Sequence, residues 1–198
     1  MDTITHVVYI NLDHRTDRRA QVEKELACFG NRVERLSATR HKTGGIGCSM
    51  SHIRALEKAK DASWANVLIV EDDFMWTGQK EKGLEHLTLL TAQPYDVIVL
   101  GGVSARYNPV TLRLQSCQTA TAYLVAAHYY DTLLANFKEG LEGFLRSNVY
   151  GEYALDQFWK RLQSVDTWFI ISPGLCIQRP SYSDIEHRNV DYRRAFTQ

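Results

Sequence analysis

The sequence predicts an α/β protein with a Rossmann-like, mostly parallel sheet flanked by helices, in a single compact domain spanning residues 1–198. Short apolar, β-branched runs alternate with segments of helical periodicity through the first hundred residues. These runs lack the polar alternation of half-exposed strands, so they are typical of strands buried on both faces of a sheet. With 198 residues, 44% hydrophobic and 23% charged, the chain has the size and composition of one globular domain.

The expected strands share continuous apolar character, and turn-forming or charged residues bound most of them. They are residues 7–12, 33–36 (a short element), 67–70, 95–100, 119–125 and 168–171. The pattern is regular up to about residue 100 and more mixed after it. We therefore expect the parallel part of the sheet to come mainly from the first half of the chain.

Helices are expected where apolar residues recur at helical spacing. Thr16 or Asp17 can cap the first helix, which is expected to end at Gly30. Ser49 or Ser51 can cap the second helix, after a flexible glycine loop at residues 43–47. The remaining expected helices cover residues 84–90, 128–137 and 155–162.

The charge balance and the apolar pattern argue against several classes of partner and location. Lys and Arg number 23 and Asp and Glu also number 23, so no basic excess favours a nucleic-acid polymer. No apolar run approaches the ~20 residues of a membrane span, and residues 1–6 contain no basic signal-peptide region. The four cysteines are scattered without a CxxC pair, which favours free thiols. We therefore expect a cytoplasmic protein with no membrane span.

Three consecutive acids, Glu71, Asp72 and Asp73, follow the buried strand at residues 67–70. Side chains two apart in a strand point the same way, so Glu71 and Asp73 are expected to share one face. Such carboxylates repel each other unless a cation, a basic group or a proton lies between them. Because open α/β sheets bind ligands beyond the carboxyl ends of their strands, a divalent metal carrying a phosphorylated ligand suits this position. A solvated acidic turn is the alternative.

Two other segments lie where a nucleotide is expected. The turn at residues 11–19 follows the first strand, where an arginine can pair with phosphate and an acidic or amide side chain can hold ribose or base. Residues 44–52 form a glycine-rich segment running into a helix start, where backbone N–H groups favour phosphate. This segment matches neither the Walker A nor the GxGxxG pattern. A solvated turn, and a structural role for His52, are the alternatives.

Several motifs in order across nearly the whole chain carry a family resemblance. They are residues 8–12 with Arg15, Asp17 and Arg18; residues 47–52; residues 68–73; and, later, residues 119–125, Asp156 and residues 181–185. Together they resemble glycosyltransferase family 25, which holds bacterial lipooligosaccharide galactosyltransferases and procollagen galactosyltransferases. The resemblance implies a GT-A fold and inverting transfer of galactose or glucose from a UDP-sugar. Within the single domain, the resemblance implies a nucleotide-sugar-binding half at 1–103 and an acceptor-side half at 104–180. The C-terminal tail at 181–198 is expected to be either a mobile flap or a frayed end.

The resemblance also implies roles for individual residues. Glu71-Asp72-Asp73 would play the part of the DxD motif, with Glu71 and Asp73 binding Mn²⁺ or Mg²⁺. A glutamate at the first place leaves open which carboxylate contacts the ion. His187 is a candidate further ligand, with an exposed tail histidine as the alternative. The expected donor-binding residues are Asn11, Leu12, Arg15, Asp17, Gly47, Ser51, His52 and Asp72.

Inverting transfer requires a general base that takes the proton of the acceptor hydroxyl. Asp156 is the first candidate, because it lies near a helix start and resembles the family's aspartate after the strand at 119–125. Glu152, one turn earlier, is the second. The alternative is that both acids only favour the helix dipole.

Two other functions remain open from the sequence. A Mg²⁺-dependent phosphohydrolase could use the same acidic cluster, and a non-catalytic domain could bind a sugar nucleotide without turnover. The acceptor could be a lipooligosaccharide, as in lipopolysaccharide biosynthesis, another glycan, or a hydroxylysine-bearing protein, as in collagen glycosylation. A bacterial or viral cytosolic enzyme fits the expected lack of a signal peptide better than a secretory one. The sequence does not predict an oligomeric state.

Overall fold

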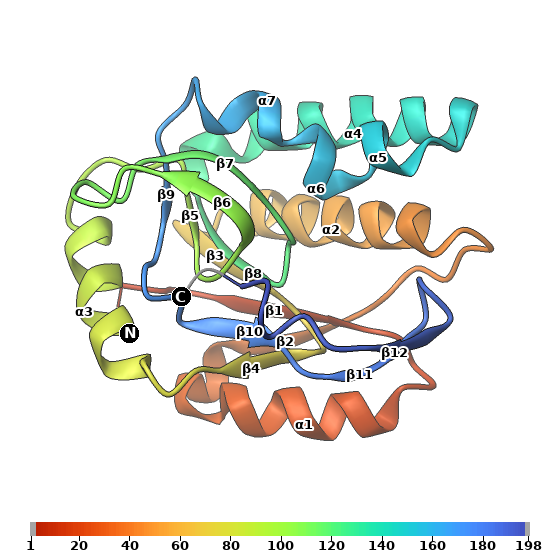
Figure 1. Ribbon diagram of the computed structural model, residues 1–198, viewed down its shortest axis with the longest axis horizontal. Helices are drawn as coiled ribbons and strands as arrows, with labels where there is room; N and C mark the ends of the chain where they lie inside the picture. The colour runs from red at the N-terminus through yellow and green to blue at the C-terminus, as the bar shows by residue number, and fades with distance from the viewer. Residues whose placement is uncertain (1–2, 197–198) are drawn as a thin grey trace.

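In the computed structural model, strands from both halves of the chain share one central sheet (Figure 1). The structure describes residues 3–196; Met1, Asp2, Thr197 and Gln198, which belong to the predicted domain, lie outside the described residues. The six strands run in the order β2-β1-β3-β8-β5-β9. β8 is antiparallel to both of its neighbours, and the other pairs are parallel. This confirms the Rossmann-like α/β fold and the mostly parallel sheet.

The elements of this sheet and of the smaller strand pairs have the following bounds. The central strands are β1 (Val7–Asn11), β2 (Val33–Ser37), β3 (Asn66–Glu71), β5 (Val97–Val99), β8 (Ala122–Ala126) and β9 (Trp168–Ile170). The paired outer strands are β4 (Phe74–Trp76) with β10 (Cys176–Gln178), β6 (Val103–Tyr107) with β7 (Leu114–Gln118), and β11 (Ser181–Ser183) with β12 (Arg188–Val190). The helices are α1 (Thr16–Leu26), α2 (Gly44–Asp61), α3 (Lys80–Thr91), α4 (Tyr130–Ser147), α5 (Tyr150–Tyr153), α6 (Leu155–Phe158) and α7 (Lys160–Gln163), with 3₁₀ turns at Ala27–Arg32 and Ala127–Tyr129.

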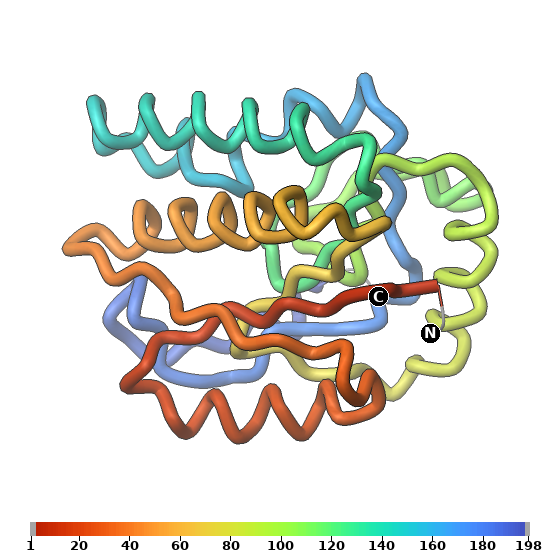
Figure 2. Tube along the Cα trace, turned by 180° about the vertical axis from the view of Figure 1, so that it is seen from behind, coloured from red at the N-terminus to blue at the C-terminus, as the bar shows by residue number. Residues whose placement is uncertain are grey.

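Helices cover both faces of the central sheet, which explains its apolar strands (Figures 1 and 2). Val8 and Ile10 of β1 pack with α2 and α4 in one core cluster. Val7 and Tyr9 point the other way and pack with α1 and α3 in a second cluster. The period-2 geometry of a strand thus divides one apolar run between two cores.

The predicted glycine loop before α2 is wrong. Residues 44–47 form the first turn of the helix, and Ser49 and Ser51 lie inside it. Their hydroxyls donate to the carbonyls of Gly45 (3.1 Å) and Gly47 (2.7 Å), one turn back, instead of capping the helix. The low helix propensity of glycine is outweighed here by packing, because a Cβ at Gly45 would lie 3.0 Å from the rings of both Phe144 and Tyr150.

The predictions for α1 and for the C-terminal segment also need correction. α1 begins at Thr16 without a side-chain capping bond within the described chain, and the Asp17 carboxylate instead accepts hydrogen bonds from the Arg15 guanidinium (2.9 and 3.0 Å). The segment from Ser181 is a β11–β12 hairpin, not a frayed end. Arg15 and Arg18 both donate to the carbonyl of Tyr182, which ties the hairpin to α1. The helix expected at 155–162 is broken into α6 and α7.

Gly47 lets α2 approach the loop that follows β2, because a Cβ there would lie 2.5 Å from the carbonyl oxygen of Thr39. We expect Gly47→Ala to lower the free energy of unfolding by about 1–3 kcal/mol, the usual cost of overpacking. The higher helix propensity of alanine alone would stabilise the helix by up to about 1 kcal/mol. A loss of stability would therefore come from the close approach to Thr39. Urea unfolding followed by circular dichroism measures it. Gly151→Ala in α5, where a Cβ meets nothing within 4 Å, is the matched control and is expected to be neutral or slightly stabilising. Equal effects of the two variants would contradict the packing account.

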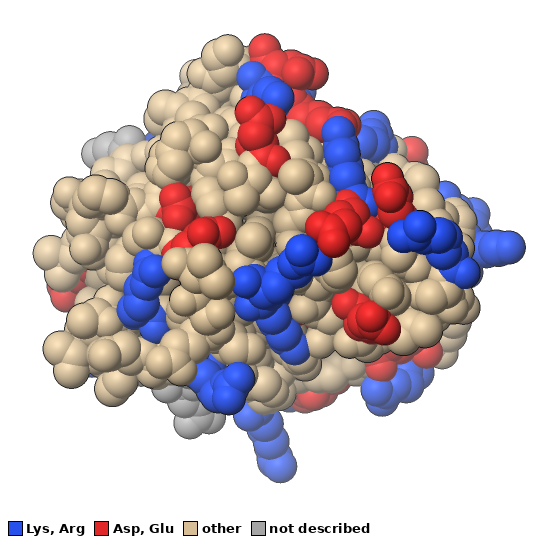
Figure 3. Space-filling view, turned by 90° about the horizontal axis from the view of Figure 1, so that it is seen from above, with Lys and Arg blue, Asp and Glu red and all other residues tan. Residues whose placement is uncertain are grey.

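Between residues 3 and 196, no helix combines the length and the apolar character needed to cross a membrane. On the face that lies over α4 to α7, acidic and basic side chains are interspersed, and no continuous patch of one sign is visible there among the described residues (Figure 3). The equal numbers of acidic and basic residues in the sequence are thus matched by their mixed distribution on this face.

Candidate active site

A cavity of about 1050 Å³ lies at the carboxyl-terminal edge of the parallel strands. Its wall is formed by residues that follow β1, β2 and β3, by those that precede the antiparallel β8, and by parts of α2, α6 and the β11–β12 hairpin. The predicted site residues that line it are Leu12, Gly47, Ser51, His52, Glu71, Asp72, Asp73, Asp156 and His187. The position agrees with the rule that open α/β sheets bind ligands beyond the ends of their strands, and the volume suits a small-molecule ligand.

Four predicted site residues do not line this cavity. Asn11 is buried behind it and donates to Asp72 Oδ2 (2.8 Å) and to the Arg15 carbonyl (3.1 Å). The Arg15 guanidinium is engaged by Asp17 and Asp184, and Asp17 is exposed on α1. Glu152 is exposed on α5. Asn11 and Arg15 therefore contact the wall of the cavity from outside and hold it in place.

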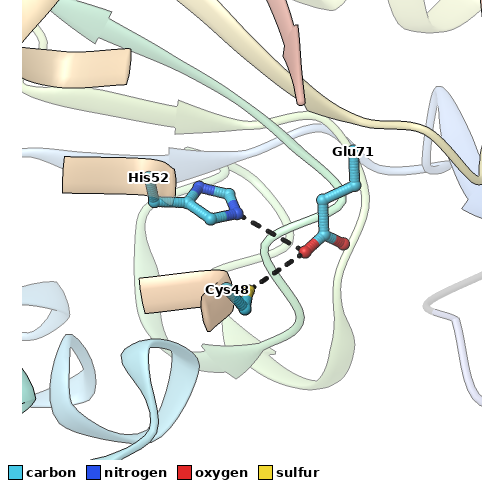
Figure 4. A group of neighbouring side chains, drawn as sticks. All are labelled: Cys48, His52 and Glu71. Atoms are coloured by element: carbon cyan, nitrogen blue, oxygen red, sulfur yellow. Dashed lines mark hydrogen bonds and ion pairs between the residues drawn. The ribbon is translucent and has the colours of Figure 1, made fainter. Parts of the chain in front are cut away.

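Glu71, at the end of β3, is contacted by two side chains of α2 (Figure 4). His52 Nε2 lies 3.4 Å and Cys48 Sγ 3.6 Å from Glu71 Oε1. Burial would raise the pKa of Glu71, but the contacts with His52 and Cys48 and the charge of Arg18 outweigh it and lower the pKa. Glu71 is therefore ionised near neutral pH.

Asp72 points to the other side of the strand end, toward β1 and α1. Its Oδ1 accepts from Arg18 NH1 (2.7 Å), and its Oδ2 accepts from Asn11. Arg18 is itself buried, and its NH2 also donates to Ser181 Oγ (2.7 Å) in the hairpin. A buried charge pair of this kind depends on both partners, because removing one leaves the other unpaired in a low-dielectric site.

Asp73 is the least satisfied of the three acids. Its Oδ1 is buried and has no hydrogen-bond partner among residues 3–196, and its Oδ2 lies 3.6 Å from Arg18 NH1. Burial and the negative charge of Glu71 raise the pKa of Asp73 to about 8. The surroundings of Glu71 and Asp73 thus carry too little positive charge to keep both carboxyl groups ionised near neutral pH.

This arrangement fits a hard divalent cation. Carboxylate oxygens are the ligands that Mg²⁺ and Mn²⁺ prefer, and Asp73 Oδ1 is a buried acceptor without a donor within residues 3–196. Glu71, Asp72 and Asp73 place three carboxyl groups on the wall, and the guanidinium of Arg18 contacts two of them. His187 lies at the turn of the hairpin, exposed, and also lines the cavity.

Asp156 lies in the same cavity, in the first turn of α6. The backbone N–H of Thr119 donates to its Oδ2 (3.0 Å), and Gln157 Nε2 lies 3.4 Å from its Oδ1. Burial raises the pKa of Asp156 despite the Thr119 bond, with a further contribution from the charge of Glu71. A carboxylate with a raised pKa is better matched to proton abstraction near neutral pH than an exposed one.

Sequence reasoning missed several residues of the wall. Arg18 was recognised in the family motif but not assigned to the site, although its place on α1 just beyond β1 was a usable signal. Cys48 was likewise quoted only as part of a motif. Thr119 and Tyr182 also line the cavity and were quoted only within motifs of the family resemblance, whereas Gln178 was marked by no local pattern.

Comparison with known proteins places these features in context. No protein-family model matches the chain. It is 24% identical over 177 residues to "Putative glycosyltransferase R655" of Acanthamoeba polyphaga mimivirus, covering 76% of this chain and 52% of that protein. The chain thus spans about half the length of this relative.

A solved structure with a TM-score above 0.5 shares the fold at low sequence identity. A glycosyltransferase involved in the glycosylation of the major capsid of PBCV-1 superposes with a TM-score of 0.54 at 9% identity, covering 88% of this chain and 93% of that chain. The glycosyltransferase GlyE of Streptococcus pneumoniae TIGR4 gives a TM-score of 0.48 at 10% identity, over 85% of this chain and 45% of that chain. The chain therefore has the Rossmann-like fold of a solved glycosyltransferase, and its similarity to the mimivirus protein supports a glycosyltransferase.

Proposed function

We propose that the protein is a metal-dependent, inverting glycosyltransferase of the family 25 type. It would move galactose or glucose from a UDP-sugar to a hydroxyl of a glycan or of a hydroxylysine-type protein acceptor. The observation that carries the proposal is the buried Asp73 carboxylate, which has an unpartnered oxygen and lines the same cavity as Asp156. The motif order in the sequence supports the family, and the mimivirus relative supports the reaction class.

The donor side of the cavity is formed by the strand-end acids and the first turn of α2. Glu71 and Asp73, with His187 from the hairpin, are the proposed ligands of Mn²⁺ or Mg²⁺. The bound cation would neutralise the charge that develops on the departing diphosphate. Leu12, Gly47 and Ser51 line the wall where the nucleotide is proposed to bind. Arg18 places a buried positive charge beside the strand-end acids, while Asp72 and Asn11 hold its guanidinium and the end of β1 in register.

Asp156 is the proposed general base. It would take the proton of the acceptor hydroxyl as that oxygen bonds to the anomeric carbon and the bond from this carbon to UDP breaks, with inversion. The Thr119 N–H holds Oδ2, and the raised pKa makes the carboxylate a stronger base. Glu152 is a weaker candidate, because it is exposed and does not line the cavity.

The proposal predicts UDP release from UDP-galactose or UDP-glucose that requires a divalent cation. The purified chain is incubated with each donor and a panel of glycan and hydroxylysine acceptors, with Mn²⁺, with Mg²⁺ or with EDTA. We expect acceptor-stimulated UDP release that EDTA abolishes and Mn²⁺ restores. Release of inorganic phosphate from nucleotides would instead indicate a phosphohydrolase. UDP binding without turnover on any donor would indicate a non-catalytic domain, and activity undiminished by EDTA would refute the metal dependence.

A further inference from the structure

Cys48, His52 and Glu71 form a group of three different metal-binding side chains at the edge of the cavity (Figure 4). Cys48 and His52 are four residues apart on α2, so they lie on one face of the helix and both point toward the end of β3. One ligand atom from each of the three residues lies within 4.8 Å of the other two. The site proposed above for Mn²⁺ or Mg²⁺ does not use the cysteine or the histidine of this group.

The separations within the group also fit ligands of a shared cation. His52 Nε2 and Glu71 Oε1 are 3.4 Å apart, longer than a good N–H···O bond of about 2.7–3.2 Å, and Cys48 Sγ and Glu71 Oε1 are 3.6 Å apart. With Zn–N and Zn–O bonds of about 2.0–2.1 Å and a Zn–S bond of about 2.3 Å, tetrahedral geometry places nitrogen and oxygen about 3.3 Å apart and sulfur and oxygen about 3.5 Å apart. Both observed separations are within about 0.1 Å of these values.

The surroundings of the group are also those of a metal-binding histidine. The His52 side chain is 1% exposed, and its other ring nitrogen, Nδ1, lies 2.8 Å from the hydroxyl of the buried Tyr123. Such a partner on the second nitrogen orients the ring of a metal ligand. Glu71, Asp73 and Asp156 line the same cavity as Cys48 and His52, so carboxyl groups surround the place that a cation would occupy.

We propose that Cys48, His52 and Glu71 bind a thiophilic divalent cation of the Zn²⁺ class, at a site that shares only Glu71 with the one proposed for Mn²⁺ or Mg²⁺. Thiolate and imidazole ligands select Zn²⁺ over Mg²⁺ or Mn²⁺. On binding, the Cys48 thiol loses its proton to solvent and its sulfur bonds to the cation. His52 binds through Nε2 and carries its proton on Nδ1, from which it donates to the Tyr123 hydroxyl. Three protein ligands leave a fourth position for water or a ligand oxygen from the cavity, as in open zinc sites.

The site has a consequence for the proposed reaction, because Glu71 belongs to both ligand sets. Zn²⁺ held by Cys48 and His52 engages Glu71 and competes with its proposed role toward Mn²⁺. The existence of the site does not depend on sugar transfer, so it is tested with the metal alone.

The test uses Co²⁺ as a spectroscopic substitute for Zn²⁺ on the purified, reduced, metal-free full chain. We expect one equivalent of Co²⁺ to give a near-ultraviolet thiolate-to-cobalt charge-transfer band and the visible bands of tetrahedral Co²⁺, and one equivalent of Zn²⁺ to abolish both. Cys48→Ser is expected to lose the charge-transfer band, and the affinity for Zn²⁺ measured by calorimetry should fall at least about 100-fold, the upper end of the loss from removing an outer-shell partner.

Two further variants keep the test decisive if Cys48→Ser folds poorly. Tyr123→Phe retains all three ligands and is expected to lower Zn²⁺ affinity about 10–100-fold, as loss of an outer-shell partner does. Cys28→Ser removes an exposed thiol in the 3₁₀ turn that follows α1, outside this group, and should leave the spectrum unchanged. A wild-type Co²⁺ complex without a charge-transfer band would overturn the proposal. A band that survives in Cys48→Ser, or that disappears in Cys28→Ser, would do the same.

Discussion

Asp73→Asn is expected to lower metal-dependent UDP release about 10³-fold, which is the scale of losing one preorganised electrostatic group in an active site. The amide keeps the size of the side chain, but it cannot ionise to bind a cation at the buried oxygen that has no partner within residues 3–196. Initial rates with saturating Mn²⁺ and UDP-galactose or UDP-glucose measure the effect. Asp61→Asn, at the exposed end of α2, is the matched control and should retain full activity.

The same variant is expected to be more stable than the wild type when metal is removed. Because the pKa of Asp73 is raised from 3.8 to about 8, the folded protein holds a proton between these pH values that the unfolded chain has lost. The contribution of Asp73 to the free energy of unfolding is therefore fully present below about pH 4, and it falls as the pH rises toward 8. At pH 8 in EDTA, Asp73→Asn should melt at a higher temperature than the wild type, and the difference should shrink as the pH is lowered toward 4.

This pairing of lost activity with gained stability separates a functional carboxylate from a structural one. If Asp73→Asn unfolded at a lower temperature than the wild type across pH 5–8, Asp73 would be an ordinary structural acid. Unchanged UDP release in a stably folded variant would remove Asp73 from the site.

Asp156→Asn is expected to lower kcat for transfer by about 10²–10⁴-fold, the usual contribution of a general base. The amide can still accept the Thr119 N–H bond, so the local structure should be retained. The affinity for UDP with Mn²⁺, measured by calorimetry, should remain close to that of the wild type because the lost step is proton transfer. Glu152→Gln separates the two candidate bases: it should keep its activity, and the reverse result would transfer the role to Glu152.

The parts of the fold that could be predicted from the sequence are those whose burial produces a local pattern of apolar residues. β1, β3, β5 and β9 are buried on both faces, so continuous apolar runs marked them. The outer strands β4 and β10 have three residues each and exist through pairing with each other, about 100 positions apart in the chain. No local signal specifies such a pair. The start of α2 was missed for a similar reason, since its glycines are held in helical form by Phe144 and Tyr150 from elsewhere.

The candidate site was likewise predicted only where a local pattern marks its residues. The acids at 71–73 were identified because a buried strand ending in three carboxylates is unusual, and their position in the cavity agrees with that prediction. Their partners were not identified: Arg18 is 54 positions from Asp72, and the pairing follows from the packing of α1 beside β3. Likewise the hairpin residues contact the cavity because Arg15 and Arg18 tie Tyr182 to α1, a contact spanning more than 160 positions.

The antiparallel β8 has a consequence for synthesis on the ribosome. It hydrogen-bonds to β3 on one side and to β5 on the other, yet it follows both in the chain. A nascent polypeptide that has emerged only as far as residue 110 therefore exposes the open edges of two apolar strands with nothing to join them. The sheet between β3 and β5 cannot close until Ala126 has left the exit tunnel, and until then these edges are open to mispairing.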